Sequence, residues 1–97
     1  MAPIHILAFQ HAKTEWILDL SKEIKNLVEL SRMEKGCLFY RVYVEKNRQN
    51  IFIFDEKWHS QEALDDHFQS PFFQTFWKAR MHYLEKDVEL YFLSDFS

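Results

Sequence analysis

Two neighbouring strands that are apolar on both faces constrain the fold of this chain more than any other feature. Side chains of a strand alternate between its two faces. In residues 37–45 both sets are largely apolar, and residues 51–58 carry aromatic side chains on one face and isoleucines on the other. A half-solvated sheet would alternate apolar and polar residues instead. Since helices can cover only one face of such a sheet, we expect a second copy to cover the other face in a symmetric homodimer.

The order of the predicted elements is that of a ferredoxin-like α+β fold. Strands are predicted over residues 4–10, 37–45, 51–58 and 88–93. An amphipathic helix follows the first strand, with Thr14 as its N-cap and Gly36, the only glycine, as its stop. Two short helices precede the last strand, one capped by Ser60 and one opened by Pro71. The order β-α-β-β-α-α-β predicts an antiparallel sheet with helices on one face.

Length and composition predict a single domain over residues 1–97. Of the 97 residues, 47% are hydrophobic and 18% are aromatic, which is enough to build a core. The chain also carries more aromatic side chains than a small monomer hides comfortably. This excess is a second reason to expect an oligomer.

Charge and hydropathy exclude several classes of partner. The formal net charge is -3 and no basic run occurs, so nucleic acid is not an expected partner. No stretch approaches the roughly 20 apolar residues that span a bilayer, and the N-terminus lacks the regions of a signal peptide. Cys37 is the only cysteine, which is typical of a reducing compartment. We therefore expect a cytoplasmic protein without membrane partners, and no ligand spacing predicts a metal site.

A carboxylate and an imidazole supply the candidate acid-base chemistry. Glu56 lies on the aromatic face of its predicted strand, where desolvation demands a hydrogen-bond partner or raises the pKa of the carboxyl group. His67 lies on the inward side of the first short helix. In the catalytic hypothesis His67 accepts a proton from the substrate and Glu56 orients or charge-balances the imidazole. In the structural alternative the two side chains satisfy one another and lock the helix to the sheet.

Aromatic side chains are the candidates for lining a substrate pocket beside this pair. They are Trp58, Tyr40, Phe72, Phe76 and Trp77. An electron-rich phenol or quinol reacts with dioxygen without metal or flavin once a base removes its proton, and a dry aromatic pocket suits this reaction. Aromatic residues at helical spacing are also typical of simple core packing, so the pattern fits both interpretations.

Three motifs resemble the antibiotic biosynthesis monooxygenase family. They are E-x-G-C-x-x-Y beginning at Glu34, E-x-W beginning at Glu56 and H-x-x-S-P beginning at His67, in that order over nearly the whole chain. The resemblance implies a dimeric α/β barrel built from ferredoxin-like chains. It also implies several activities, because the family includes cofactor-independent oxygenases of quinols and polycyclic phenols, heme-degrading enzymes, an isomerase of a sugar phosphate and members without known activity.

The heme-degrading branch is disfavoured by this sequence. The resemblance implies an axial histidine on the helix after Pro71, a tryptophan at a strand end and an asparagine on the first strand. Trp58 matches the tryptophan, but the other two positions hold Trp77 and Gln10. His82 lies more than one helical turn too far along. We therefore expect no cofactor.

Three functions remain as hypotheses. The preferred one is a cofactor-independent monooxygenase that oxidises a quinol or polycyclic phenol, with a small aromatic substrate and a second copy of the chain as partners. The second is an isomerase or lyase that applies the same acid-base pair to a small carbonyl or sugar-phosphate substrate. The third is a dimeric ligand-binding protein without catalysis.

Overall fold

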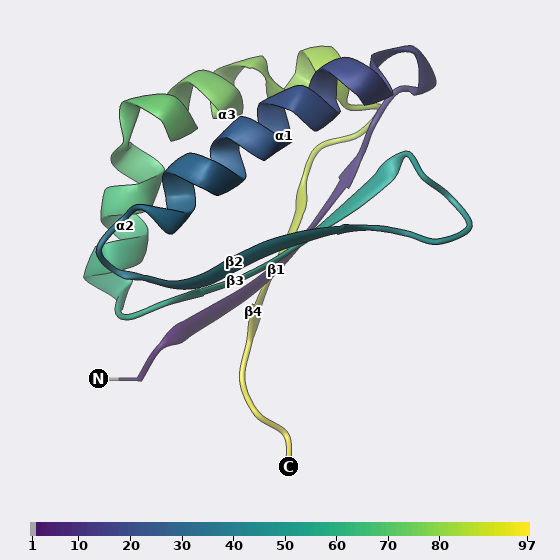
Figure 1. The fold of residues 1–97 in the computed structure, drawn as a ribbon. Coiled ribbons are helices and arrows are strands. Elements are labelled where there is room, and N and C mark those ends of the chain that lie inside the picture. The colour runs from purple at the N-terminus through teal and green to yellow at the C-terminus, as the bar shows by residue number, and fades with distance from the viewer. Residues whose placement is uncertain (1) are drawn as a thin grey trace.

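A computed structural model describes residues 2–97. The chain forms a 4-stranded sheet with its helices on one face (Figure 1). This confirms the predicted ferredoxin-like α+β order. The elements are β1 (Ile4–His11), the 3-10 helix η1 (Thr14–Trp16), α1 (Ile17–Arg32), β2 (Cys37–Val44), β3 (Ile51–Trp58), α2 (Gln61–Gln69), α3 (Pro71–Tyr83) and β4 (Glu89–Leu93).

The sheet places β1 and β3 at its centre. The strand order is β2-β3-β1-β4, and every neighbouring pair is antiparallel. In the register of β1 with β3, Ile6 lies opposite Glu56 and Gln10 lies opposite Phe52. Residues four apart on one strand point to the same face, and residues paired across two strands share a face. All four side chains therefore lie on the helix-covered face.

The hydrophobic core lies between the helices and this inner face of the sheet. Helix α1 contributes Leu20, Ile24 and Leu27, which recur at helical spacing and are buried. The predicted division of β3 is confirmed, since its aromatic face points into the core. The buried apolar residues of this core are Ile6, Ala8, Ala12, Leu20, Ile24, Leu27, Tyr40, Phe52, Phe54, Trp58, Leu64, Phe76 and Leu84.

The two short helices begin as predicted, whereas the first helix does not. The Ser60 hydroxyl accepts a hydrogen bond from the backbone N–H of Ala63 at 3.1 Å, and Pro71 is the first residue of α3. Thr14, in contrast, is not an N-cap. It opens η1, the single 3-10 turn that leads into α1, and no side-chain hydrogen bond caps either element.

Gly36 does not end helix α1, contrary to the prediction. The helix ends at Arg32, with Met33 as its C-cap, and Gly36 does not adopt a positive φ angle. Its lack of a side chain serves a close contact instead. A Cβ atom placed on Gly36 would lie 2.2 Å from the Cβ of Ala63 on α2. The loop before β2 therefore packs directly against α2 because residue 36 has no Cβ.

We expect Gly36→Ala to lower the free energy of unfolding by about 1–3 kcal/mol, the usual cost of overpacking. Ala63→Gly alone is expected to cost less, about 0.5–1 kcal/mol, because it adds backbone entropy within a helix. In the double variant the steric clash is absent. Its loss of unfolding free energy should therefore be smaller than the sum of the losses in the two single variants. Urea unfolding of the three variants measures this, and strict additivity would contradict the proposed contact.

The outer face of the sheet is not covered by any helix within residues 2–97 (Figure 1). It carries aromatic side chains, of which Tyr43 and Tyr91 are each 50% exposed, and Phe9 packs edge-on against Tyr91. It also carries a hydrogen-bonded pair in which His5 Nε2 and Asp55 Oδ1 are 2.7 Å apart. In the described part of the chain, no helix has the length and hydropathy needed to cross a bilayer.

Candidate active site

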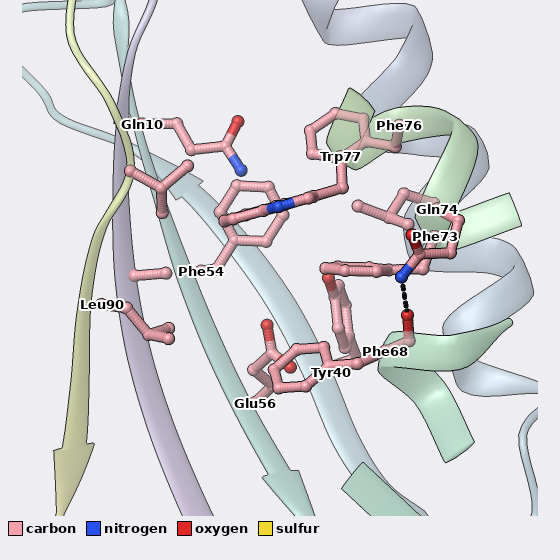
Figure 2. Close-up of a pocket in the computed structure, with 13 residues that line it drawn as sticks. Gln10, Tyr40, Phe54, Glu56, Phe68, Phe73, Gln74, Phe76, Trp77 and Leu90 are labelled. Atoms are coloured by element: carbon pink, nitrogen blue, oxygen red, sulfur yellow. Dashed lines mark hydrogen bonds between the residues drawn. The ribbon is translucent and has the colours of Figure 1, made fainter. Parts of the chain in front are cut away.

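An apolar cavity of about 310 Å³ lies between α3 and the inner face of the sheet (Figure 2). This volume is at the lower end of the range for small-molecule pockets. Leu90 lines the cavity while 43% of its surface stays exposed, so the cavity reaches solvent beside β4. The lining residues are Ala8, Gln10, Leu27, Tyr40, Phe54, Glu56, Phe68, Phe73, Gln74, Phe76, Trp77, Val88 and Leu90.

A small residue on the central strand leaves room for the cavity. Ala8 lies between Phe54 on β3 and Leu90 on β4 in the strand register. Side chains at these three neighbouring positions point toward the helices, and the alanine methyl group is much the shortest. The cavity floor is therefore a consequence of alanine at position 8.

Glu56 supplies the carboxyl group of the cavity lining, and it is buried. Its Oε1 atom accepts a hydrogen bond from Trp58 Nε1 at 2.8 Å. Burial raises the pKa of Glu56 from 4.5 to about 7, although hydrogen bonds from Trp58 and Tyr40 partly oppose this shift. A carboxyl group with this pKa exchanges its proton near neutral pH, which is what a general base requires.

Gln10 is a second buried polar residue of the lining, and its side chain is incompletely paired. It is 4% exposed, and its Oε1 atom has no hydrogen-bond partner among the described residues. In Figure 2 its amide group points in among the lining side chains beside Trp77. An unpaired buried amide is costly, because the group has lost its hydrogen bonds to water.

His67 lies in the core beside the cavity and does not belong to its lining. Its partner is Glu34 rather than Glu56, since His67 Nδ1 and Glu34 Oε1 are 2.5 Å apart. Burial lowers the pKa of His67 to about 4, and burial together with the charge of Asp66 raises the pKa of Glu34 to about 7. His67 is therefore a neutral imidazole at pH 7.

The imidazole of His67 reaches the site indirectly. Its ring lies 4.3 Å from that of Trp58, centroid to centroid, with 32° between the planes. Trp58 in turn donates its indole N–H to Glu56. The Nε2 atom of His67 has no hydrogen-bond partner among residues 2–97. His67 thus packs against Trp58, and Trp58 in turn holds the carboxyl group of Glu56 through its hydrogen bond.

The structure brings four of the seven predicted site residues to the cavity. Glu56, Tyr40, Phe76 and Trp77 line it, whereas His67, Trp58 and Phe72 do not. Phe72 packs near the ring of His67 instead, at 5.9 Å between centroids. Five polar or aromatic residues of the lining were not predicted from the sequence, namely Gln10, Phe54, Phe68, Phe73 and Gln74.

Trp77 is held as a rigid wall of the cavity. Its ring stacks on Phe73 at 5.7 Å and 18°, and the guanidinium carbon of Arg80 lies 3.8 Å from its centroid. Arg80 is held in turn by two hydrogen bonds to Asp87, of 2.8 and 3.1 Å. This arrangement combines aromatic stacking with a cation–π contact, and together they hold the position of the indole.

The raised pKa of Glu56 predicts a characteristic pH dependence of stability. Between pH 4.5 and about 7 the folded protein holds a proton on Glu56 that the unfolded chain has lost, so the free energy of unfolding falls as the pH rises. The total effect is on the order of 3 kcal/mol. Glu56→Gln removes this pH-dependent contribution to the free energy of unfolding and leaves that of His67 in place. As the pH rises from 5 to 8 in thermal unfolding, the variant should therefore gain stability relative to the wild type. A stability difference that does not change with pH would contradict the raised pKa.

Several known proteins are similar to this chain in sequence or in fold. A Synechocystis sp. (strain ATCC 27184 / PCC 6803 / Kazusa) protein, uncharacterized protein sll1783, is 37% identical over 78 residues, which cover 80% of this chain and 51% of that protein. The chain therefore spans about half the length of that relative. YcnE of Bacillus subtilis (strain 168) is 30% identical over 73 residues, which cover 75% of this chain and 77% of YcnE. The structure of Rv0793 from Mycobacterium tuberculosis has the same fold, with a TM-score of 0.92, 21% identity, and coverage of 99% of this chain and 97% of that chain.

The fold and the cavity define a class of small ferredoxin-like α+β proteins with an apolar cavity between the sheet and its helix layer. Within this class the sequence identifies one family. The family model described as antibiotic biosynthesis monooxygenase matches residues 3–79, so the chain belongs to that family.

Proposed function

We propose that this protein is a monooxygenase that oxidises a quinol or polycyclic phenol with dioxygen and without a cofactor. The observation that carries the proposal is a buried carboxyl group, Glu56, with a pKa of about 7 in the lining of an apolar cavity. The family supports the reaction class, and the name of YcnE provisionally assigns that relative to the monooxygenases.

The lining of the cavity favours a neutral aromatic substrate over a sugar phosphate. Among the described lining residues there is no lysine, arginine or histidine. A phosphate group in an apolar cavity without a cation would keep an unpaired charge, which is strongly unfavourable. A flat aromatic substrate is neutral until deprotonation, and Tyr40, Phe73 and Trp77 give it surfaces for stacking. The isomerase alternative on a sugar phosphate is therefore the weaker candidate.

In the proposed reaction Glu56 removes a proton from the bound substrate. For an anthrone-like phenol the resulting carbanion gives up electrons to dioxygen, and a carbon–oxygen bond forms. Glu56 returns the proton to the peroxide, giving a hydroperoxide. Loss of the remaining hydrogen on that carbon then breaks the O–O bond and releases water. The CH₂ group has become a carbonyl, dioxygen has supplied one atom to the product and one to water, and Glu56 ends as it began.

We assign His67 as a positioning residue for this base. Its neutral ring packs against Trp58, and Trp58 donates the hydrogen bond that orients Glu56. The hydrogen bond to Glu34 holds the imidazole on α2 against the loop before β2. The proton acceptor in this proposal is thus Glu56, and the histidine acts through the tryptophan.

The same protein is proposed to be a cytoplasmic homodimer that buries the outer face of the sheet. The half-exposed Tyr43 and Tyr91 on this face support the proposal, because large apolar surfaces on small proteins are usually covered by a partner. Light scattering should give twice the chain mass of 11.9 kDa. A mass of one chain at micromolar concentration would contradict the dimer.

Oxygen consumption tests the proposed reaction class. Hydroquinones, naphthoquinols and anthrone-like phenols are supplied in turn, and the rate with protein is compared with the spontaneous rate. Ala8→Leu is the matched control, because leucine on the cavity floor fills substrate space while adding apolar contacts. We expect acceleration by the wild type and little by the folded variant. If no substrate is oxidised faster with protein, the ligand-binding alternative replaces the oxygenase.

A further inference from the structure

We infer that the cavity selects an elongated ligand with a polar group at each end and an apolar aromatic body between them. Gln10 binds one end and Glu56 binds the other. The inference rests on the proposed function only for the identity of the site, since it concerns binding and not oxidation. It assigns to Gln10 a role in ligand recognition.

The strand register sets the separation of the two polar groups. Glu56 lies opposite Ile6 on β1, and Gln10 lies four residues further along the same strand. At about 3.3 Å per residue the two positions are about 13 Å apart along the strands. Both side chains lie on the helix-covered face, so a ligand that pairs with both must be elongated along the strands. Two fused aromatic rings with hydroxyl groups at their far corners reach further in this direction than a single ring does.

The wall between the two ends is mostly aromatic. In Figure 2 Gln10 and Glu56 lie at opposite ends of the lining side chains, and Phe54, Phe73 and Trp77 lie between them. Gln74 is the polar residue of this wall, and its amide nitrogen already donates a hydrogen bond to the backbone oxygen of Phe68. A polar group in the middle of the ligand would therefore replace few of its hydrogen bonds to water. The body of the ligand must be apolar, and the stacked rings of Phe73 and Trp77 favour a flat one.

The unpaired amide oxygen of Gln10 indicates that this end recognises a ligand. Gln10 is 4% exposed and its Oε1 atom has no partner among residues 2–97. A leucine of similar size would fill the position without an unsatisfied polar atom, so the glutamine costs stability unless a ligand pairs with it. A phenolic hydroxyl suits the amide, because it both donates and accepts a hydrogen bond.

Binding under argon tests this inference separately from oxidation. The probes are 2,6-dihydroxynaphthalene, which has both polar ends, 2-naphthol, which lacks one, and hydroquinone, which is too short. Quenching of tryptophan fluorescence gives the dissociation constants for the wild type and for Gln10→Leu. We expect the variant to bind 2,6-dihydroxynaphthalene about tenfold more weakly, as the loss of one hydrogen bond implies. Its affinity for 2-naphthol should change less than twofold.

The remaining outcomes also decide the inference. Gln10→Leu should unfold at the same temperature as the wild type or higher, which shows that weaker binding is not a folding defect. The inference is overturned if the variant weakens both naphthalene probes equally or neither, if hydroquinone binds as tightly as 2,6-dihydroxynaphthalene, or if the wild type binds none of them. Because oxygen is absent, a protein that binds as expected but oxidises nothing contradicts the proposed function alone.

Discussion

Replacing Glu56 by glutamine is expected to lower the rate of oxygen-dependent turnover by about 10²- to 10⁴-fold, the usual contribution of a general base. Glutamine has nearly the same shape and keeps an oxygen that can accept the hydrogen bond of Trp58 Nε1, so the cavity should keep its form. It cannot accept a proton from the substrate. The measurement is oxygen consumption at saturating substrate, with folded concentration matched by circular dichroism. The loss should appear in kcat more than in KM, because the base acts on bound substrate.

Glu62→Gln is the matched control for this experiment. It makes the same chemical change on the exposed surface of α2, away from the cavity lining. Its rate should stay within a factor of two of the wild type. If Glu56→Gln behaves like Glu62→Gln, then Glu56 is a structural carboxyl group and the proton is removed by another group or by solvent.

His67→Ala is expected to lower the free energy of unfolding by about 3 kcal/mol or more, because it leaves a cavity among aromatic rings and removes a buried hydrogen bond. The His67 side chain is fully buried, it contacts the ring of Trp58, and it pairs with Glu34. Urea unfolding measures the loss. His59→Ala is the matched control, because His59 is exposed and its removal should change stability by about 0.5 kcal/mol or less.

The pH profile separates a positioning role of His67 from a purely structural one. If His67 acts through Trp58 on Glu56, the folded fraction of His67→Ala should show an altered apparent pKa in its rate profile, because the hydrogen bond from the indole is no longer fixed. A variant whose remaining folded protein turns over with the wild-type profile would contradict the positioning role. It would leave His67 as a residue of the core.

The sequence allowed the fold to be predicted in detail because its signals are local. The aromatic face of residues 51–58 follows from strand alternation. Ser60 marks a helix start through a hydrogen bond within one turn, and Pro71 marks another through its fixed φ angle and its missing N–H. The burial of Glu56 followed from the same alternation. The element order then left few topologies to consider.

The contacts that distinguish the site join distant parts of the chain, and no local pattern reveals them. Glu34 pairs with His67 across 33 positions, and Gly36 owes its place to Ala63 on another element. Glu56 was therefore expected beside His67, although Trp58 links them in the structure. Gln10 carried a weak signal, because it is the polar residue on an inward strand face that otherwise holds Ile4, Ile6 and Ala8.

Turnover in isotopically labelled dioxygen tests the central claim most directly. The substrate that consumes oxygen fastest is incubated with the wild type in unlabelled water, and the product is analysed by mass spectrometry. We predict one labelled oxygen atom in each product molecule, with formation strongly reduced in Glu56→Gln. A product without label, or labelled product formed equally fast by Glu56→Gln, would contradict a monooxygenase whose base is Glu56.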